Sequence, residues 1–328
     1  MSKWLAGVNI VAVALALGVT WTFYYYTGWQ WLWETLPQMP KFFGLGLLNI
    51  EFWIRILAVL LLILAPVILA FTTVFAFATT ASELHAVRKW HRYAKSQEGK
   101  ADRWVKWYTP SQRLQHFGVK ITLLLCAVTG FGMYFANNPY WKLVLNLDRD
   151  LMVTLHIFSG IAMGIVALGH FFHYLTVFLG TASRRGFREA FKSFPLSQVL
   201  LLPTYLKTVK ELVAWVVRGG AKPKYHKYHF EHHLEYWGEM WGIAVIGITG
   251  VLMVLYGPAI LNGALWLLHV VEAVLAVTIS FALYLAIEHF RPYVFPVDNV
   301  YISGKMPLKR VMEEHPLFYR EIKEVGRL

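Results

Sequence analysis

Two histidines, His156 and His170, lie fourteen residues apart in one long apolar run, between residues 150 and 180. Fourteen residues of α-helix rise about 21 Å and return to nearly the same face, so both imidazoles would point the same way near opposite sides of a bilayer. Ionisable side chains are costly inside a membrane and indicate function there. Since neutral imidazole is an axial ligand of haem iron, the spacing favours two haems, one above the other.

Other histidines lie at the same two heights. Of the thirteen in the chain, six fall in or at the edges of apolar segments: His116, His156, His170, His173, His269 and His289. The expected topology places His156 and His269 near the outer face and the other four near the inner face. An interhelical hydrogen bond is the alternative role for any single membrane histidine. The histidines between residues 226 and 233 lie in a basic, tyrosine-rich loop, where we expect interfacial side chains in preference to a metal site.

Composition indicates an integral membrane protein. The 328 residues are 57% hydrophobic with a mean hydropathy of +0.47, which is too apolar for a soluble protein. The formal charge of +12 comes from basic residues between the apolar runs, so it indicates topology and argues against nucleic acid as a partner. The single cysteine, Cys126, excludes internal disulfides, cysteine-ligated iron–sulfur clusters and thioether-bound haem.

Six apolar segments are long enough to span a membrane, near residues 4–23, 55–79, 112–136, 151–179, 236–256 and 264–289. The first two lack histidine and predict an N-terminal hairpin. The last four carry the membrane histidines and predict a four-helix bundle that holds two haems. The first segment resembles a signal peptide core but lacks a clean cleavage site, so we expect a retained helix. The charged, apolar stretch 199–217 predicts an interfacial helix.

Basic residues alternate between the loops. Loops 83–113 and 181–235 and the tail from 291 are basic, whereas the connections on the other side carry few basic residues. The positive-inside rule therefore places both termini in the cytoplasm of a bacterial or archaeal cell, with the chain in its cytoplasmic membrane. The expected organisation is an all-α protein with a hairpin over 1–82, a cytoplasmic loop over 83–111, a core over 112–292 that includes the interfacial segment 181–235, and a cytoplasmic tail over 293–328.

Short motifs in the core point to one family. Arg113-Leu-Gln-His116-Phe, Leu155-His156-Ile-Phe-Ser-Gly160 and Leu268-His269 resemble the first, second and fourth core helices of the cytochrome b (gamma) subunit of membrane-bound formate dehydrogenases. The stretch His315-Pro316-Leu-Phe-Tyr319-Arg320-Glu321 resembles its tail, and the motifs from Lys222 to Pro296 resemble a longer, formate-dehydrogenase-like branch. The similarity covers about residues 108–325.

The resemblance implies two b haems, with His156 and His269 as ligands of the outer one and His116 as one ligand of the inner one. The family's remaining inner ligand falls at Leu283. We therefore expect His170, at the right height on the neighbouring helix, to replace it.

Two other histidines are alternatives to His170. His173 would serve if the helix turned the other way. His289 lies roughly 9 Å beyond Leu283 on a continuous helix, which is too shallow.

We therefore expect a membrane di-haem cytochrome b that passes electrons between an iron–sulfur subunit of a formate dehydrogenase-like complex and menaquinone or ubiquinone. The resemblance implies a quinone site near the cytoplasmic haem and a partner catalytic subunit with molybdenum or tungsten. The chain would be the quinone-reactive subunit of an oxidoreductase. Alternative partners are a hydrogenase, a thiosulfate reductase or a multihaem cytochrome. An alternative of another class is a proton-coupled transporter, although no inverted repeat is evident.

Overall fold

The structure, a computed structural model, describes residues 24–38, 49–67, 69–70, 103–137, 147–193, 224–228, 230–284 and 299–324, and single positions between them. Within these ranges it contains five helices that are long and apolar enough to cross a membrane. They are Ile50–Val67, α5 (Pro110–Tyr134), α7 (Arg149–Arg185), the Tyr236–Tyr256 part of α11 (Phe230–Tyr256), and Ile260–Val277, most of which belongs to α12 (Ala264–Tyr284). The prediction of an all-α membrane protein is confirmed.

Five of the six expected spans coincide with these helices. The sixth, residues 4–23, lies outside the described residues apart from position 21 and position 18. The same holds for most of the expected interfacial helix over 199–217 and for residues 71–79 of the second span.

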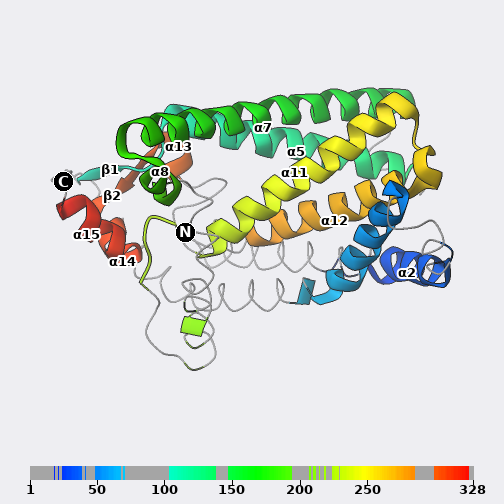
Figure 1. The fold of residues 1–328 in the computed structure, drawn as a ribbon, viewed down its shortest axis with the longest axis horizontal. Coiled ribbons are helices and arrows are strands. Elements are labelled where there is room, and N and C mark those ends of the chain that lie inside the picture. Colours follow the sequence, from blue (N-terminus) through cyan, green and yellow to red (C-terminus); the bar gives the residue numbers. More distant parts are fainter. Residues whose placement is uncertain are drawn as a thin grey trace.

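The four core helices form two hairpins, α5 with α7 and α11 with α12 (Figure 1). The two helices of each hairpin pack more closely on each other than on the other hairpin. Helix α5 begins with a capping box, because Thr109 Oγ1 accepts from the backbone N–H of Gln112 at 3.2 Å and the Gln112 side chain accepts from the N–H of Thr109 at 2.9 Å. Helix α7 is capped by Asp148, the residue before its first turn, whose carboxylate accepts from two backbone N–H groups. These caps fix where both helices of the first hairpin start.

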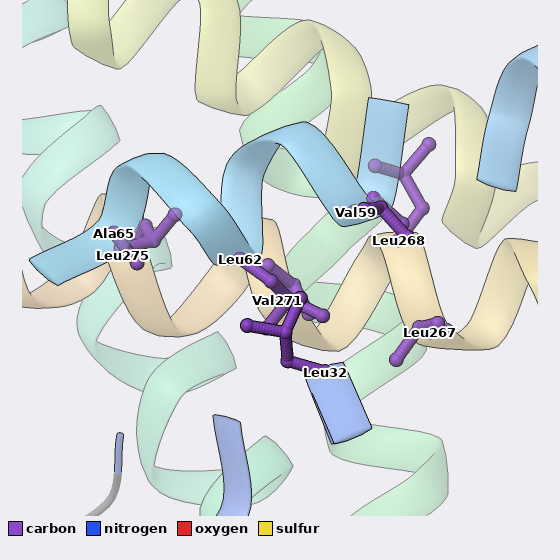
Figure 2. Packing of buried hydrophobic residues seen from close by; sticks show 9 residues of the cluster. Leu32, Val59, Leu62, Ala65, Leu267, Leu268, Val271 and Leu275 are labelled. Carbon is purple, nitrogen blue, oxygen red and sulfur yellow. The ribbon is translucent and has the colours of Figure 1, made fainter. Parts of the chain in front are cut away.

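The N-terminal helices pack against α12. Figure 2 shows side chains of the helix Ile50–Val67 and of α2 (Trp29–Thr35) meeting one face of α12. The buried cluster comprises Leu32, Ala58, Val59, Leu62, Ala65, Leu267, Leu268, Val271 and Leu275. Because this face of α12 is buried against the N-terminal helices, the adjoining His269 and Glu272 are directed elsewhere.

Many large apolar side chains of the core helices are exposed. On α5 and α7 they include Leu114, Ile121, Phe158, Ile165 and Leu168. An exposed apolar surface of this extent suits contact with lipid.

Segments that the sequence places in separate loops form one small unit, which we call the tail unit (residues 103–109, 224–228 and 299–324). Strand β1 (Trp104–Lys106) pairs antiparallel with β2 (Lys305–Pro307), beside helices α13 (Asn299–Ser303), α14 (Leu308–Glu314) and α15 (Pro316–Glu324). A buried cluster holds it together: Trp107, Val300, Met306, Val311 and Ile322. In Figure 1 the tail unit lies at one end of the helical bundle, opposite α2.

Lys227 ties residues 224–228 to the rest of the tail unit. Its ammonium donates to the carbonyl of Trp107 at 2.7 Å and lies 5.4 Å from the centre of the Trp107 ring and 5.2 Å from that of Tyr228. Burial lowers the pKa of Lys227 to about 8, so the amine is mostly protonated at neutral pH and retains its cation–π contacts.

At the other end of the bundle, the turn between α11 and α12 is held by charged groups from the N-terminal helix. Leu261 and Asn262 both have left-handed backbone conformations, with φ of 50° and 52°. Arg55 donates to the Asn262 carbonyl at 3.0 Å and to the Glu51 carboxylate at 2.9 Å, and Asn262 Nδ2 donates to that carboxylate at 3.2 Å. The strained turn is thereby stabilised from outside its own hairpin.

Arg55→Lys should lower the thermal unfolding temperature, because a lysine ammonium cannot reproduce the planar donor geometry of the guanidinium. We expect the free energy of unfolding to fall by about 1–3 kcal/mol, which is the cost of buried polar groups left without hydrogen-bond partners. Arg188→Lys, at an exposed position of α8 (Phe187–Ser193), is the matched control. Equal unfolding temperatures for the two variants would contradict the role of Arg55.

Candidate functional site

The structure brings His156 and His269 together inside the bundle. His156 comes from α7 and His269 from α12, so each hairpin contributes one imidazole. The two ring centroids are 6.2 Å apart and the ring planes are inclined at 70°. This is the pair that the sequence places at one height.

Both imidazoles are tethered through Nδ1 in the same way. Nδ1 of His156 lies 3.0 Å from Thr129 Oγ1 and 3.1 Å from the carbonyl oxygen of Cys126. Nδ1 of His269 lies 2.9 Å from Thr249 Oγ1. The partner residues come from the other helix of the same hairpin, α5 in one case and α11 in the other.

The hydrogen-bond network assigns the tautomer of each ring. Each threonine has one hydroxyl proton, and it is donated to a carbonyl one turn earlier, from Thr129 to Leu125 at 2.6 Å and from Thr249 to Val245 at 2.7 Å. The threonine oxygens must therefore accept from Nδ1–H of the histidines. The carbonyl of Cys126 can only accept a hydrogen bond, so it also requires a proton on Nδ1 of His156.

Nε2 of each ring therefore carries a lone pair. Among the described residues, neither Nε2 atom of His156 and His269 has a hydrogen-bond partner. An imidazole with Nδ1–H bonded to an oxygen and Nε2 free is the form that ligates metal ions. The two rings are thus prepared as ligands.

Glycines leave room around the rings. A Cβ at Gly130 would lie 3.2 Å from Cε1 of His156, and a Cβ at Gly250 would lie 3.5 Å from Cε1 of His269. One and two turns beyond His156, Gly160 and Gly164 are half-buried, and a Cβ built there would meet nothing within 4 Å. The backbone recedes where a flat group would lie beside the rings.

The donor set fits haem better than a bare metal ion. Two imidazoles on opposite sides of one first-row metal ion, with bonds of about 2 Å, have ring centres roughly 6 Å apart. In the described part of the chain, no group of three or more His, Cys, Asp or Glu side chains is placed to hold a metal ion. A porphyrin would supply the four further nitrogens that two histidines lack.

His170 has a different environment. The Gln115 amide nitrogen donates to Ser111 at 3.2 Å, so its oxygen, 2.8 Å from Nδ1 of His170, accepts from that nitrogen. Nε2 of His170 then accepts from the Tyr236 hydroxyl at 2.7 Å. Both ring nitrogens are occupied in this structure, so ligation by His170 would require the loss of one hydrogen bond.

His116 contacts the tail unit. Its ring stacks on Tyr301 of α13, with centroids 4.3 Å apart and planes inclined at 9°. The structure therefore places His116 against Tyr301 and His170 against Gln115 and Tyr236. His173 lies edge-on to Tyr174, at 5.4 Å, and His289 lies outside the described residues.

Two further ionisable features lie between these levels. Lys120 of α5 forms an ion pair with Glu239 of α11 and so links the two hairpins. The Glu272 side chain is buried on α12, one turn from His269. Because Lys120 and Glu239 lie 119 positions apart in the sequence, their pairing becomes visible only in the structure.

Sequence reasoning missed the residues that hold the histidines: Thr129, Thr249, Gln115 and Tyr236. A signal for two of them was present, because a Thr-Gly dipeptide occurs late in the helix that precedes each ligand candidate. No model of a known protein family matches the chain, and no curated protein matches it either. Fold and site together define the chain as an all-α membrane protein with two neighbouring, tethered histidines between two helical hairpins.

Gly130→Ala and Gly250→Ala should change stability in opposite directions. The Cβ at position 130 would press on an imidazole that two hydrogen bonds hold in place, and such overpacking costs about 1–3 kcal/mol. At position 250 the contact is of ordinary length, so alanine should stabilise the helix by about 0.5–1 kcal/mol. Thermal unfolding in detergent measures both, and stabilisation by Gly130→Ala would contradict the close approach.

Proposed function

We propose that the chain is a membrane cytochrome b in which His156 and His269 would hold the iron of a haem, and that it passes electrons between a redox partner and a membrane quinone. The observation that carries the proposal is the pair of neighbouring imidazoles, whose ring centroids are 6.2 Å apart and each of which has Nδ1–H bound to a threonine oxygen. The resemblance of the motifs around both histidines supports it independently.

A haem bound there would supply one-electron redox chemistry. A haem held by two protein ligands favours electron transfer over catalysis at the iron. His156 and His269 would hold the iron, Thr129 and Thr249 would orient the two rings, and the surrounding helices would exclude water. Oxidation of a substrate would then fall to a partner subunit.

The proposed partner and orientation rest on the sequence motifs and on the basic loops. The resemblance favours an iron–sulfur subunit and a molybdenum or tungsten subunit of a formate dehydrogenase-like complex, with a hydrogenase, thiosulfate reductase or multihaem cytochrome as alternatives. The basic loops place the tail unit and both termini in the cytoplasm, and the His156–His269 level near the outer face of a bacterial or archaeal cytoplasmic membrane. Menaquinone or ubiquinone would react near the tail-unit end.

A second haem between His116 and His170 completes the proposal. His170 would release the Tyr236 hydroxyl from Nε2, and the His116 ring would separate from Tyr301. The same side chains also favour a second candidate function, proton-coupled transport, because His170–Tyr236 and the Lys120–Glu239 pair link the hairpins by polar contacts at two heights in the membrane.

The purified protein should show a b-type band in a reduced-minus-oxidised spectrum. His156→Ala and His269→Ala should each abolish the same low-spin centre, because each leaves the iron with one axial ligand. His226→Ala, in the tail unit, should leave the spectrum unchanged. A protein without any b-type band would end the cytochrome proposal and favour transport.

His170→Ala should reduce the haem content from two haems to one per chain, measured as haem per polypeptide. Tyr236→Phe is the matched control, since it removes the hydrogen bond to Nε2 of His170 and leaves the nitrogen able to bind iron. Two low-spin haems in His170→Ala, or one haem in the unsubstituted protein, would show that His170 is not a ligand.

A further inference from the structure

The same arrangement of groups surrounds each ligand histidine. In α5, Thr129 accepts from Nδ1–H of His156, Gly130 follows it, and the carbonyl of Cys126, three residues before the threonine, accepts from the same nitrogen. In α11, Thr249 accepts from Nδ1–H of His269 and Gly250 follows it, and the carbonyl three residues before the threonine, that of Ile246, lies 3.1 Å from the Thr249 hydroxyl. The second hairpin thus repeats the first around the site.

The two threonines are buried, with exposed fractions of 4% for Thr129 and 3% for Thr249. Each hydroxyl already donates its proton to the carbonyl one turn earlier. A hydroxyl that donates strongly becomes a better acceptor, so the bond from Nδ1–H is reinforced. If the imidazole ring flipped by 180°, Cδ2 would lie where Nδ1–H now lies, and this hydrogen bond would be lost.

An acceptor on Nδ1–H has an electronic consequence for the metal that the imidazole binds. It increases the basicity of Nε2, which strengthens the bond to the more highly charged, oxidised iron. The oxidised state is thereby favoured over the reduced state. Two such acceptors, one on each side of the iron, act in the same direction.

We propose that Thr129 and Thr249 are positioning residues, which fix the orientation of the two ligand imidazoles and hold the reduction potential of the centre at a lower value. This inference rests on the proposed function, since it requires that His156 and His269 bind haem iron. It assigns a role to two residues that touch neither the iron nor a substrate directly.

The test uses the full chain in detergent and substitutes valine, which keeps the shape of threonine and removes the hydroxyl. Thr129→Val, Thr249→Val and the double variant should each shift the midpoint potential of the centre to more positive values, most in the double variant. Haem affinity should fall by about 10–100-fold, the usual effect of losing a partner of a ligand histidine. Thr→Ser at either position should restore both properties.

Thr122 provides the matched control. It lies two turns earlier on α5, it is buried at 9% exposure, and its hydroxyl donates to the Gly118 carbonyl at 2.7 Å, as that of Thr129 does to Leu125. The Thr122 hydroxyl donates to carbonyls of its own helix, those of Gly118 and Val119. Thr122→Val should therefore leave the potential and the haem affinity unchanged while it removes the same kind of bond within the helix.

The outcomes separate the two proposals. A protein with a b-type centre whose potential and haem affinity are the same in the Thr129→Val/Thr249→Val double variant would overturn the positioning role and leave the cytochrome proposal intact. An equal shift in Thr122→Val would also overturn it, since the effect would then be general to the bundle. If the unsubstituted protein binds no haem, the proposed function fails, and this inference fails with it.

Discussion

The arrangement of polar groups in this bundle follows from one constraint: a polar group inside a membrane must find its partner within the protein. In the described core helices, contacts between polar side chains join the two hairpins at three heights. The contacts are His156 with His269, Lys120 with Glu239, and His170 with Tyr236. The first differs from the other two, because neither Nε2 lone pair of its two rings has a hydrogen-bond donor among the described residues. Two neighbouring imidazoles with free Nε2 atoms suit a metal ion, and this supports the proposal of haem iron between them.

Much of the architecture is predictable from the sequence because hydropathy and helical rise are local properties. Apolar length gives the five described spans, and a topology derived from basic loops puts His156 and His269 at one height. What supports the two rings is harder to predict, since it depends on which face of α5 meets α7. Thr129 looks like an ordinary helix residue until the packing of the first hairpin turns it toward Nδ1 of His156. The repeated Thr-Gly dipeptide indicates the residues that support the two rings only when equivalent positions of the two hairpins are compared.

At the other end of the bundle, the tail unit is held together by contacts between residues that are distant in the sequence. The sequence does not predict these contacts. The sequence suggests a loop over residues 103–109 and a tail over 299–324, yet β1 pairs with β2. Lys227, from a third segment, lies over the rings of Trp107 and Tyr228. Three-residue strands have too little periodicity to predict. His116 shows the consequence for the site, because its ring lies on Tyr301 of this unit, a partner that helical geometry within the membrane could not suggest.

The loose packing between the hairpins and the tight packing within them fit a site that binds a large flat group. Each hairpin fixes its own histidine through its own threonine, so neither ring depends on the opposite hairpin for its orientation. The N-terminal helices then press on the far face of α12, where Leu268 and Val271 flank His269 in sequence. The rings are therefore oriented before anything lies between them, and little reorganisation would accompany a change in the charge of a metal ion held there. A rigid ligand environment is what rapid one-electron transfer requires, whereas a relay that moves protons by turning its side chains would need the opposite.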